Sequence, residues 1–454
     1  MENSNRTKEI VLLFENYLED SKKLHTSFKM SGKSYPAVVI DDNGFLPDDV
    51  ESVYGYFLGD FEKSDRVLGK PRYFNQINVP EYWEISGNNS GGKVHELNKE
   101  RGRIFYTEPL HKRFVRVVDW YDDSGIVRSS DHYNKYGALY ARTIFNAKGH
   151  KVNKSYFSAD GKEVIVENFV TKDIILNDGD TVRVFHSKTE FVCFYLEKKG
   201  YSQCRLFYNT LATPFFVSQE LCNKDNSGQK KDVLFWQEQA RTDIPGNMQI
   251  ILNGQGTRTE AVRVLDGKAY EKLISLGANK AVVKKLGYIY DFKKENGHKP
   301  EALICTNSDR IAHCEDIIKE MPEMHFHIAA ITEMSSKLMD LEKYSNVTLY
   351  PAEKMKLLDS LFDKCDYYLD INHENEIVLA VQNAFMHNQL IMTFKETMHN
   401  RSYIAAEHIY GMADYKRMIA DLKSVLQDRE LLGKHIEMQH VSAGLENACA
   451  YDEL

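Results

Sequence analysis

The sequence contains no apolar run long enough to cross a lipid bilayer, for which about 18 residues or more are needed. Its opening segment, MENSNRTKEIVLLFENYLED, is acidic and amphipathic, and it lacks the basic region, apolar core and cleavage site of a signal peptide. The seven cysteines (193, 204, 222, 305, 314, 365 and 449) are odd in number, scattered, and without a C-x-x-C pair. This pattern is typical of a reducing compartment rather than of disulfides or a zinc site, so we expect a cytoplasmic protein.

An excess of basic residues is also absent. The chain has 58 Lys and Arg against 66 Asp and Glu, a formal charge of −8, which argues against a general electrostatic grip on nucleic acid. Hydrophobic residues make up 43% and charged residues 27% of the 454 residues, as in ordinary globular proteins. At about 150 residues per domain, this length predicts about three domains.

The first 64 residues have the sequence pattern of an α/β domain. Apolar side chains at helical spacing, among them Ile10, Phe14 and Phe28, predict a helix over 5–32 that ends at Gly32. The β-branched run at 36–40 predicts a buried strand, and the residues from 41 to 47 read as a turn-rich loop.

Glycines then recur at a constant step of twelve, at 125, 137, 149 and 161. Each ends a tetrapeptide that begins with Asp, Asn or Ser, the chemistry of a type I turn whose last residue adopts positive φ. The stretches between these turns are rich in strand formers. We therefore predict an extended antiparallel β-meander over about 65–186.

Helical periods return after residue 187, and a strand is expected at 232–236. In the last third, helical segments alternate with five strand-like segments, at 302–306, 324–330, 346–350, 365–370 and 389–394. This alternation predicts a parallel, doubly wound sheet. An amphipathic segment over 415–440 predicts one terminal helix.

Several short motifs fit ordinary structure better than chemistry. GNNSGGK (87–93) matches most of a phosphate-binding P-loop, but Val94 stands where Ser or Thr would hold magnesium, so a flexible loop is favoured. Gly254-Gln-Gly256 is favoured as a helix C-cap and turn. His325 and His327 share one face of a predicted strand, but no third metal ligand lies near them. There is no G-x-S-x-G elbow and no Ser/His/Asp constellation.

Two loops remain candidates for binding. Asn372 and His373 follow the predicted strand at 365–370, at the end where doubly wound sheets bind ligands, and a simple strand-end turn is an equal alternative. The second loop joins the strand ending at Trp236 to a helix near Pro245. Pro at an early helix position explains it structurally, while a place at an interdomain cleft would make it a binding loop.

Nine motifs occur in an order that resembles a known family: GFLPDD (44–49), YGYF (54–57), YFNQ (73–76), YWEI (82–85), IVEN (165–168), LFWQE (234–238), PGNMQ (245–249), TEMS (332–335) and YLDINH (368–373). The chain is similar over nearly its whole length to the GtfB family. These are accessory, stabilising subunits of the bacterial enzyme that O-glycosylates serine-rich-repeat adhesins.

The resemblance implies an α/β fold of the glycosyltransferase-B type. Two Rossmann-like domains, over 1–64 with 187–285 and over 286–454 with the terminal helix, would face each other across a cleft. An extended β-meander domain over 65–186 would be inserted in the first.

The resemblance also implies a function. The chain would be a non-catalytic subunit without a cofactor that pairs with a catalytic glycosyltransferase of the GtfA type and binds an unfolded Ser/Thr-rich adhesin before its export. The partner would attach GlcNAc or Glc to Ser or Thr. A heterotetramer is implied, together with peripheral association with the cytoplasmic face of the cell membrane through other components of the accessory Sec system.

An active enzyme of this architecture is expected to hold its donor with G-x-G, a Glu-Ala helix and G-x-P-V. Aligned on the strand at 390–394, the loop here reads NEIV (375–378), the Glu position falls at Asn383 and the proline position at Leu390. The loop after the strand ending at Thr306 reads NSDR (307–310), without the usual Gly-Arg and following Lys. Glu376 would repel a diphosphate.

The favoured hypothesis is therefore an acceptor-binding pseudo-glycosyltransferase. Two alternatives stay open: an active glycosyltransferase with an atypical donor site, and a carbohydrate-binding surface protein, because YFSADG (156–161) is similar to cell-wall-binding repeats. The expected acceptor-binding residues are Trp236, Gln237, Pro245, Gly246, Asn247, Asn372 and His373. The residues expected to meet the partner subunit are Tyr133, Tyr136, Tyr140 and Tyr156. No metal site is expected.

Overall fold

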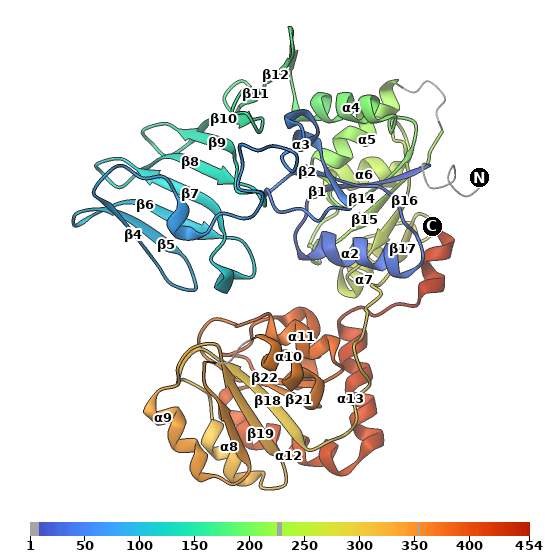
Figure 1. The fold of residues 1–454 in the computed structure, drawn as a ribbon. Helices are drawn as coiled ribbons and strands as arrows, with labels where there is room; N and C mark the ends of the chain where they lie inside the picture. Colours follow the sequence, from blue (N-terminus) through green and yellow to red (C-terminus); the bar gives the residue numbers. More distant parts are fainter. Residues whose placement is uncertain (1–8, 225–228, 353–354) are drawn as a thin grey trace. The chain divides into compact units, whose positions relative to one another are not determined.

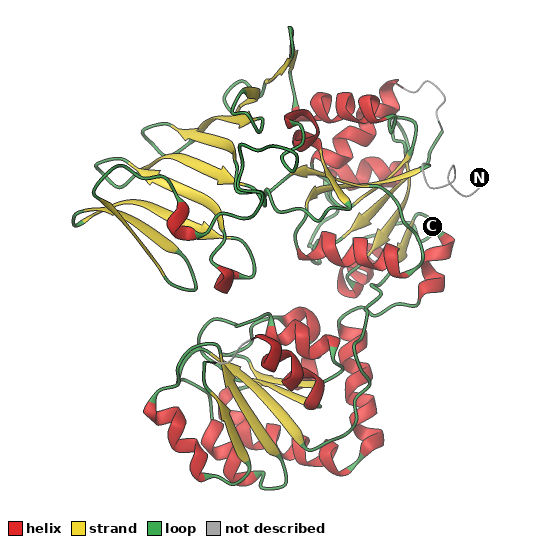
Figure 2. Ribbon diagram, viewed as in Figure 1, coloured by secondary structure: helices red, strands yellow, loops and turns green. Residues whose placement is uncertain are grey.

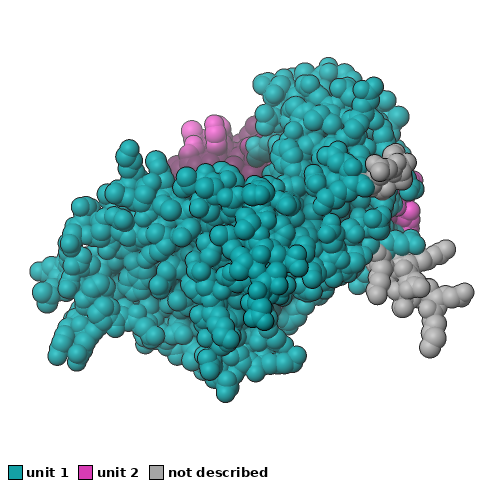
Figure 3. All heavy atoms as spheres, turned by 90° about the horizontal axis from the view of Figure 1, so that it is seen from above, with its two compact units in different colours: residues 1–286 teal, residues 287–454 magenta. Residues whose placement is uncertain are grey.

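A computed structural model describes residues 9–224, 229–352 and 355–454. The chain forms two compact units, Met1–Leu286 and Gly287–Leu454, which Figure 3 distinguishes by colour. The first unit holds a parallel sheet and an antiparallel sheet, and the second holds another parallel sheet (Figures 1 and 2). This is the α/β architecture with an early antiparallel insertion that the sequence predicts.

The parallel sheet of the first unit has seven strands among the described residues, in the order β17-β16-β15-β14-β1-β2-β3. In chain order these strands are β1 (Ile10–Asn16), β2 (Ala37–Asp41), β3 (Val50–Ser52), β14 (Arg205–Tyr208), β15 (Asp232–Trp236), β16 (Thr259–Val264) and β17 (Val283–Lys285). The helices around them are α2 (Glu19–Met30), α3 (Val53–Leu58), α4 (Lys188–Lys199), α5 (Thr213–Lys224), α6 (Gly246–Asn253) and α7 (Gly267–Ser275).

The helix predicted over 5–32 is wrong in its first half. Residues 5–8 lie outside the described residues, Ile10–Asn16 form strand β1, and only Glu19–Met30 are helical. The strand carries the apolar run IVLLF and lies between β14 and β2, so side chains on both of its faces are buried. A short apolar run of this kind has no period that separates a buried strand from a buried helix.

The antiparallel sheet is the predicted meander, with ten described strands paired in sequence order. They are β4 (Trp83–Gly87), β5 (Gly92–Glu96), β6 (Lys99–Tyr106), β7 (Val115–Tyr121), β8 (Val127–Tyr133), β9 (Leu139–Phe145), β10 (Lys151–Phe157), β11 (Glu163–Asn168), β12 (Ile174–Asp178) and β13 (Thr181–Phe185). The short helices η1 (Phe74–Gln76) and η2 (Leu110–Lys112) lie beside it. All four periodic glycines adopt φ of 76–80°, and each donates its N–H to the carbonyl three residues earlier, as the turn repeat predicts.

The meander shares one hydrophobic core with the parallel sheet of its unit. Tyr156 of β10 stacks on Tyr54 of α3, with ring centroids 4.5 Å apart, and both rings are buried. Tyr140 is buried in the same core, and Tyr133 is buried in a second core within the meander. Burial therefore corrects the expectation that Tyr133, Tyr140 and Tyr156 meet a partner subunit, because their rings pack inside this chain. Tyr136 is half-buried against Phe61.

The loop after β2 is hydrogen-bonded to the β8–β9 hairpin. Gly44 accepts a hydrogen bond from the Lys135 N–H at 2.8 Å, and the Tyr140 hydroxyl donates to the Asp42 carbonyl at 3.1 Å. Gly44 has φ of +85°, and a Cβ at this position would lie 2.7 Å from the Tyr133 carbonyl oxygen. Only glycine satisfies both the backbone conformation and this close approach.

In the second unit, six described strands form a parallel sheet in the order β20-β19-β18-β21-β22-β23. They are β18 (Glu301–Thr306), β19 (His325–Ala330), β20 (Val347–Tyr350), β21 (Tyr367–Asp370), β22 (Leu390–Phe394) and β23 (Ile409–Tyr410). The helices are α8 (Cys314–Glu320), α9 (Ser336–Met339), α10 (Met355–Lys364), α11 (Ala380–Met386), α12 (Tyr415–Gln427) and α13 (Arg429–Ser442). The short helices are η3 (Asp340–Lys343), η4 (Arg401–Tyr403), η5 (Ala406–His408), η6 (Met412–Asp414) and η7 (Ala448–Glu453).

This sheet is covered on both faces. Ala302 and Ile304 of β18 belong to the core that includes α8 and α12, while the alternating Leu303 and Cys305 belong to the core that includes α10 and α11. Alternate burial in two cores is the signature of a doubly wound sheet, so the five predicted strands and this architecture are confirmed. We propose the domain division 1–64 with 187–285, 65–186, and 286–454.

The single terminal helix predicted over 415–440 is two helices, α12 and α13, which meet at Asp428. The Asp428 carboxylate accepts the N–H groups of Glu430 and Leu431 at 2.9 and 3.1 Å. The amphipathic pattern is continuous across this point, but an aspartate that caps the second helix interrupts the backbone.

We predict that Gly44→Ala destabilises the first unit by about 1–3 kcal/mol more than Gly149→Ala, because overpacking adds to the strain of positive φ. Gly149 is the matched control: its φ is +76°, but no atom lies within 4 Å of a Cβ built there. Urea unfolding of the two variants measures the difference. Equal losses would show that the close approach at Gly44 contributes nothing.

Candidate functional site

The first candidate site lies at the carboxyl ends of β14 and β15, the edge at which parallel sheets bind ligands. A cavity of about 390 Å³ opens there. Its lining includes three of the expected binding residues, and the whole lining is Thr210, Leu211, Ala212, Glu238, Arg241, Pro245, Gly246 and Asn247. Pro245 is the N-cap of α6, and Asn247 donates from its side-chain amide to the Leu211 carbonyl at 2.9 Å.

The other two residues expected here do not line this cavity. Trp236 is buried within β15, with 1% of its surface exposed, so it supports the sheet and cannot contact an acceptor. The Gln237 amide bonds to two neighbouring segments: it donates to the Asp20 carbonyl in α2 at 2.8 Å and accepts from Asn209, after β14, at 2.9 Å.

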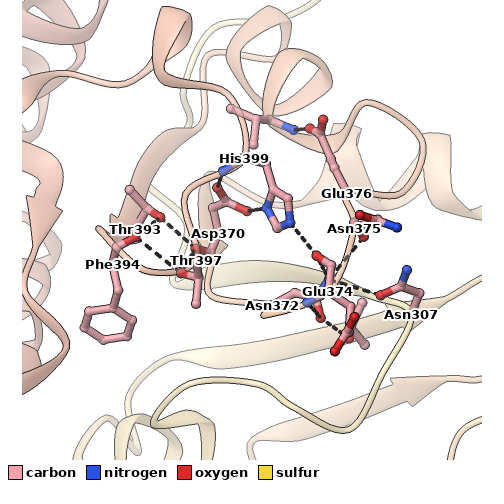
Figure 4. A network of polar contacts seen from close by, with 12 residues as sticks. Asn307, Asp370, Asn372, Glu374, Asn375, Glu376, Thr393, Phe394, Thr397 and His399 are labelled. Atoms are coloured by element: carbon pink, nitrogen blue, oxygen red, sulfur yellow. Dashed lines mark hydrogen bonds and ion pairs between the residues drawn. The ribbon is translucent and has the colours of Figure 1, made fainter.

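The second candidate site is the carboxyl edge of the sheet in the second unit, where Asn372 follows β21 (Figure 4). Asn372 is 2% exposed. Its amide oxygen accepts from Thr306 at 3.1 Å, and its amide nitrogen donates to Asn307 and to the Glu374 carbonyl at 3.2 and 3.1 Å. The side chain thus holds the strand-end turn in place. His373 donates its backbone N–H to the Arg310 carbonyl at 3.0 Å, and its side chain is half-buried.

An Asp–His pair that sequence reasoning missed fixes the same loop. The Asp370 carboxylate is 2.6 Å from His399 Nδ1, and His399 Nε2 donates to the Glu374 carbonyl at 2.6 Å (Figure 4). Burial alone would lower the pKa of His399, but the hydrogen bond to Asp370 and its negative charge outweigh burial and raise the pKa to about 9. His399 lies far from Asp370 in the sequence and belongs to no motif, so only the fold brings the two together.

The loop over 375–378, which the sequence analysis aligned with the G-x-G segment of active enzymes, is hydrogen-bonded within the chain. The Glu376 carboxylate accepts the Val381 N–H at 2.8 Å, at the start of α11. Asn383, at the position of the donor-binding Glu, donates to the Val378 carbonyl at 2.7 Å. Val378 and Leu379 both adopt φ of +51°, a conformation that favours glycine. The backbone here adopts a conformation typical of glycine, although Val and Leu occupy the two positions.

The charges at this edge are unfavourable for a nucleotide diphosphate. Arg310 is paired with Glu374 at 2.9 Å, and Glu376 adds a second carboxylate nearby. An anion here would have to displace the Glu374 carboxylate from the arginine and approach Glu376 against like-charge repulsion.

The remaining sequence motifs have structural roles. GNNSGGK (87–93) spans the β4–β5 hairpin, and Gly254 is the αL C-cap of α6. The rings of His325 and His327 lie 4.8 Å apart, hydrogen-bonded to Thr348 and Tyr350 respectively. Within the described ranges no group of three possible metal ligands occurs, and no described helix is long and apolar enough to cross a membrane.

Four domain families match consecutive parts of the chain: the GtfB N-terminal domain (11–57), the GtfB middle domain (83–186), the GtfB third domain (188–276) and the GftB/GlyA-F C-terminal domain (302–439). A UDP-N-acetylglucosamine–peptide N-acetylglucosaminyltransferase stabilizing protein GtfB from Streptococcus gordonii is 40% identical over 95% of this chain and 94% of its own length. The chain belongs to the GtfB family. The GtfB protein of Streptococcus pneumoniae is 41% identical over 94% of this chain and 95% of its own length.

A solved structure agrees with this assignment. The crystal structure of a GtfA/B complex bound to UDP and GlcNAc contains a chain that matches with a TM-score of 0.90 and 39% identity, over 98% of both chains. The glycosyltransferase-B-like fold expected from the resemblance is therefore confirmed. The GtfB relatives are named as stabilizing proteins rather than as the transferase, in agreement with the expected non-catalytic subunit.

We predict that the His399–Asp370 pair makes the stability of the second unit depend on pH. Because the folded pKa of His399, about 9, lies above its unfolded value near 6.5, the stabilisation is complete below about pH 6.5 and is lost as pH rises through 9. The loss is on the order of 2–3 kcal/mol. Urea unfolding at pH 6, 7.5 and 9 measures it.

The variant His399→Gln should flatten this pH dependence, whereas His150→Gln, a change at an exposed turn residue, should leave it intact. A His399→Gln variant with the same pH profile as the unmodified chain would contradict the assignment of a charged His399.

Proposed function

We propose that this chain is the acceptor-binding, stabilising subunit of a peptide O-N-acetylglucosaminyltransferase, and that a catalytic glycosyltransferase of the GtfA type is its partner. The second unit supports a non-catalytic role, because Asn372, Glu376 and the Asp370–His399 pair are hydrogen-bonded to one another's loop at the carboxyl edge of the sheet, where doubly wound sheets bind ligands. Of the tyrosines expected to meet the partner, Tyr136 keeps part of its surface exposed and remains a proposed contact.

The acceptor is an unfolded Ser/Thr-rich polypeptide of an adhesin. Such a chain offers hydroxyls, carbonyls and amides but little apolar surface, so a polar groove suits it better than an apolar groove. The cavity beside Pro245, Gly246 and Asn247 suits this chemistry, because Thr210, Glu238 and Arg241 add further polar groups to its wall. Binding at each contact is weak, and repetition along the acceptor raises the overall affinity.

The modification precedes export of the adhesin. We propose that the subunit works in the cytoplasm as part of a heterotetramer of two copies of each subunit. Other components of the secretion system hold this assembly at the membrane.

We predict that the purified chain binds an unmodified Ser/Thr-rich peptide but shows no heat of binding with UDP-GlcNAc, because carboxylates and the chain's own hydrogen bonds fill the donor edge. Isothermal titration calorimetry measures both ligands. The variant Asn247→Ala should weaken peptide binding severalfold and lower the melting temperature slightly, because it also removes the hydrogen bond to the Leu211 carbonyl. Micromolar binding of UDP-GlcNAc would contradict the proposal.

An active glycosyltransferase with an atypical donor site is the alternative function. Incubation of the purified chain alone with UDP-GlcNAc and the peptide separates the two, because only the alternative yields glycosylated peptide. The same assay with the catalytic partner added serves as the positive control.

A further inference from the structure

A second polar cavity, of about 330 Å³, lies in the first unit where the face of the meander meets the carboxyl end of β2. Asp41 and Asp42 supply its wall on the side of the parallel sheet, and Lys188 at the start of α4 lies beside them. The meander supplies Thr143, Lys154 and Glu167. None of these residues belongs to the site described above.

The cavity lies on a row of polar side chains that crosses the meander. The strand register places Asp119, Ser130, Thr143, Lys154 and Glu167 opposite one another on successive strands from β7 to β11. Paired neighbours in a sheet point to the same face. This face is the one that packs against the parallel sheet, since the neighbouring positions Tyr156 and Ile165 are in the shared core. A face covered by another layer is normally apolar, so the polar row is an exception.

Most charges in the cavity compensate one another. The Lys188 ammonium is 2.9 Å from Asp41 and 3.5 Å from Glu167. Asp42 accepts the Gly44 N–H at 2.7 Å, and burial raises its pKa. These groups therefore offer hydrogen bonds without a strong net field.

Lys154 differs from its neighbours. Among the described residues its ammonium has no ion-pair or hydrogen-bond partner, and it lies over the face of the Tyr156 ring, 4.7 Å from the centroid. Burial lowers the pKa of Lys154. Its ammonium is half-buried beside Asp41, Asp42 and Glu167, and its hydrogen-bond donors remain open toward the cavity. The open donors match a ligand that brings oxygen acceptors.

We propose that this cavity receives a hydroxyl-bearing segment of the unmodified acceptor polypeptide, with Lys154 donating to its carbonyl or hydroxyl oxygens. The inference rests on the proposed function and extends the acceptor site beyond Asn247. An uncharged polar segment fits because the lining has three acidic and three basic side chains, whose charges balance.

The topology supports one continuous acceptor path. The two cavities lie at the carboxyl ends of β15 with β14 and of β2, and the order β15-β14-β1-β2 separates them by three strand intervals. At about 4.8 Å per interval the span is about 14 Å, which an extended chain at about 3.3 Å per residue covers with four to five residues. At the end of β1 between them, Glu15 has one carboxylate oxygen bonded to Thr213 and the other buried without a partner.

The test measures binding of a fluorescent, unmodified Ser/Thr-rich peptide to the full-length chain by anisotropy. Lys154→Met removes the ammonium but keeps the side-chain length and the contact with Tyr156. It should weaken binding at least fivefold while the melting temperature stays the same or rises. Lys154→Arg keeps the donors and should retain most of the affinity. Lys162→Met, at an exposed turn of the same hairpin, is the matched control and should have no effect.

Unchanged peptide affinity in Lys154→Met would overturn the inference while leaving the proposed function intact. If the unmodified chain binds no peptide at all, the proposed function itself fails. The last measurement uses the same peptide carrying GlcNAc. A lower affinity for the glycosylated peptide supports a site for the unmodified, hydroxyl-bearing segment. A preference for the glycosylated peptide that disappears in Lys154→Met would show that the cavity takes the sugar instead.

Discussion

The stack of Tyr54 on Tyr156 joins the inserted meander to the parallel sheet of the first unit. The rings lie in a core that continues from the parallel sheet into β9–β13, so the two sheets share one hydrophobic core rather than a hydrated interface. Burial of aromatic surface on this scale is among the strongest sources of packing energy available to the chain. The hydrogen-bonded loop at Gly44 and the polar cavity near Lys154 both depend on this junction, because each is built from residues of both sheets.

The second unit has a different constraint, which acts on the carboxyl edge of its sheet. Asp370, Asn372 and His399 form hydrogen bonds that hold the loop after β21 in place. The Glu376 carboxylate accepts the Val381 N–H at the start of α11. Every one of these groups is hydrogen-bonded within the chain. A donor nucleotide would have to break several of these bonds and approach two carboxylates, which is a physical reason for a glycosyltransferase-like unit to serve in a stabilising protein.

The two units thus differ in how far their buried polar groups are paired by hydrogen bonds. In the second unit the polar groups at the sheet edge satisfy one another. In the first unit some of them do not: Lys154 and one oxygen of Glu15 have capacity for further hydrogen bonds. The Glu15 oxygen is buried without a partner, which is costly, whereas Lys154 is half-buried; both groups could bond to a ligand on this side. This contrast is the physical basis on which we propose that the first unit binds the acceptor.

The periodic turns of the meander, the five strands of the second unit and the family could all be predicted from the sequence. Turn residues at a fixed glycine spacing, and apolar strands between helices, are local sequence patterns. They can be recognised without knowing which distant segments meet. The tertiary structure alone decided that Ile10–Asn16 is a strand, that Asn372 fixes a turn, and that Tyr140 and Tyr156 pack inward. It also brought His399 to Asp370 and Lys154 to Tyr156. These outcomes depend on which distant segments meet, and no local pattern in the sequence encodes that pairing.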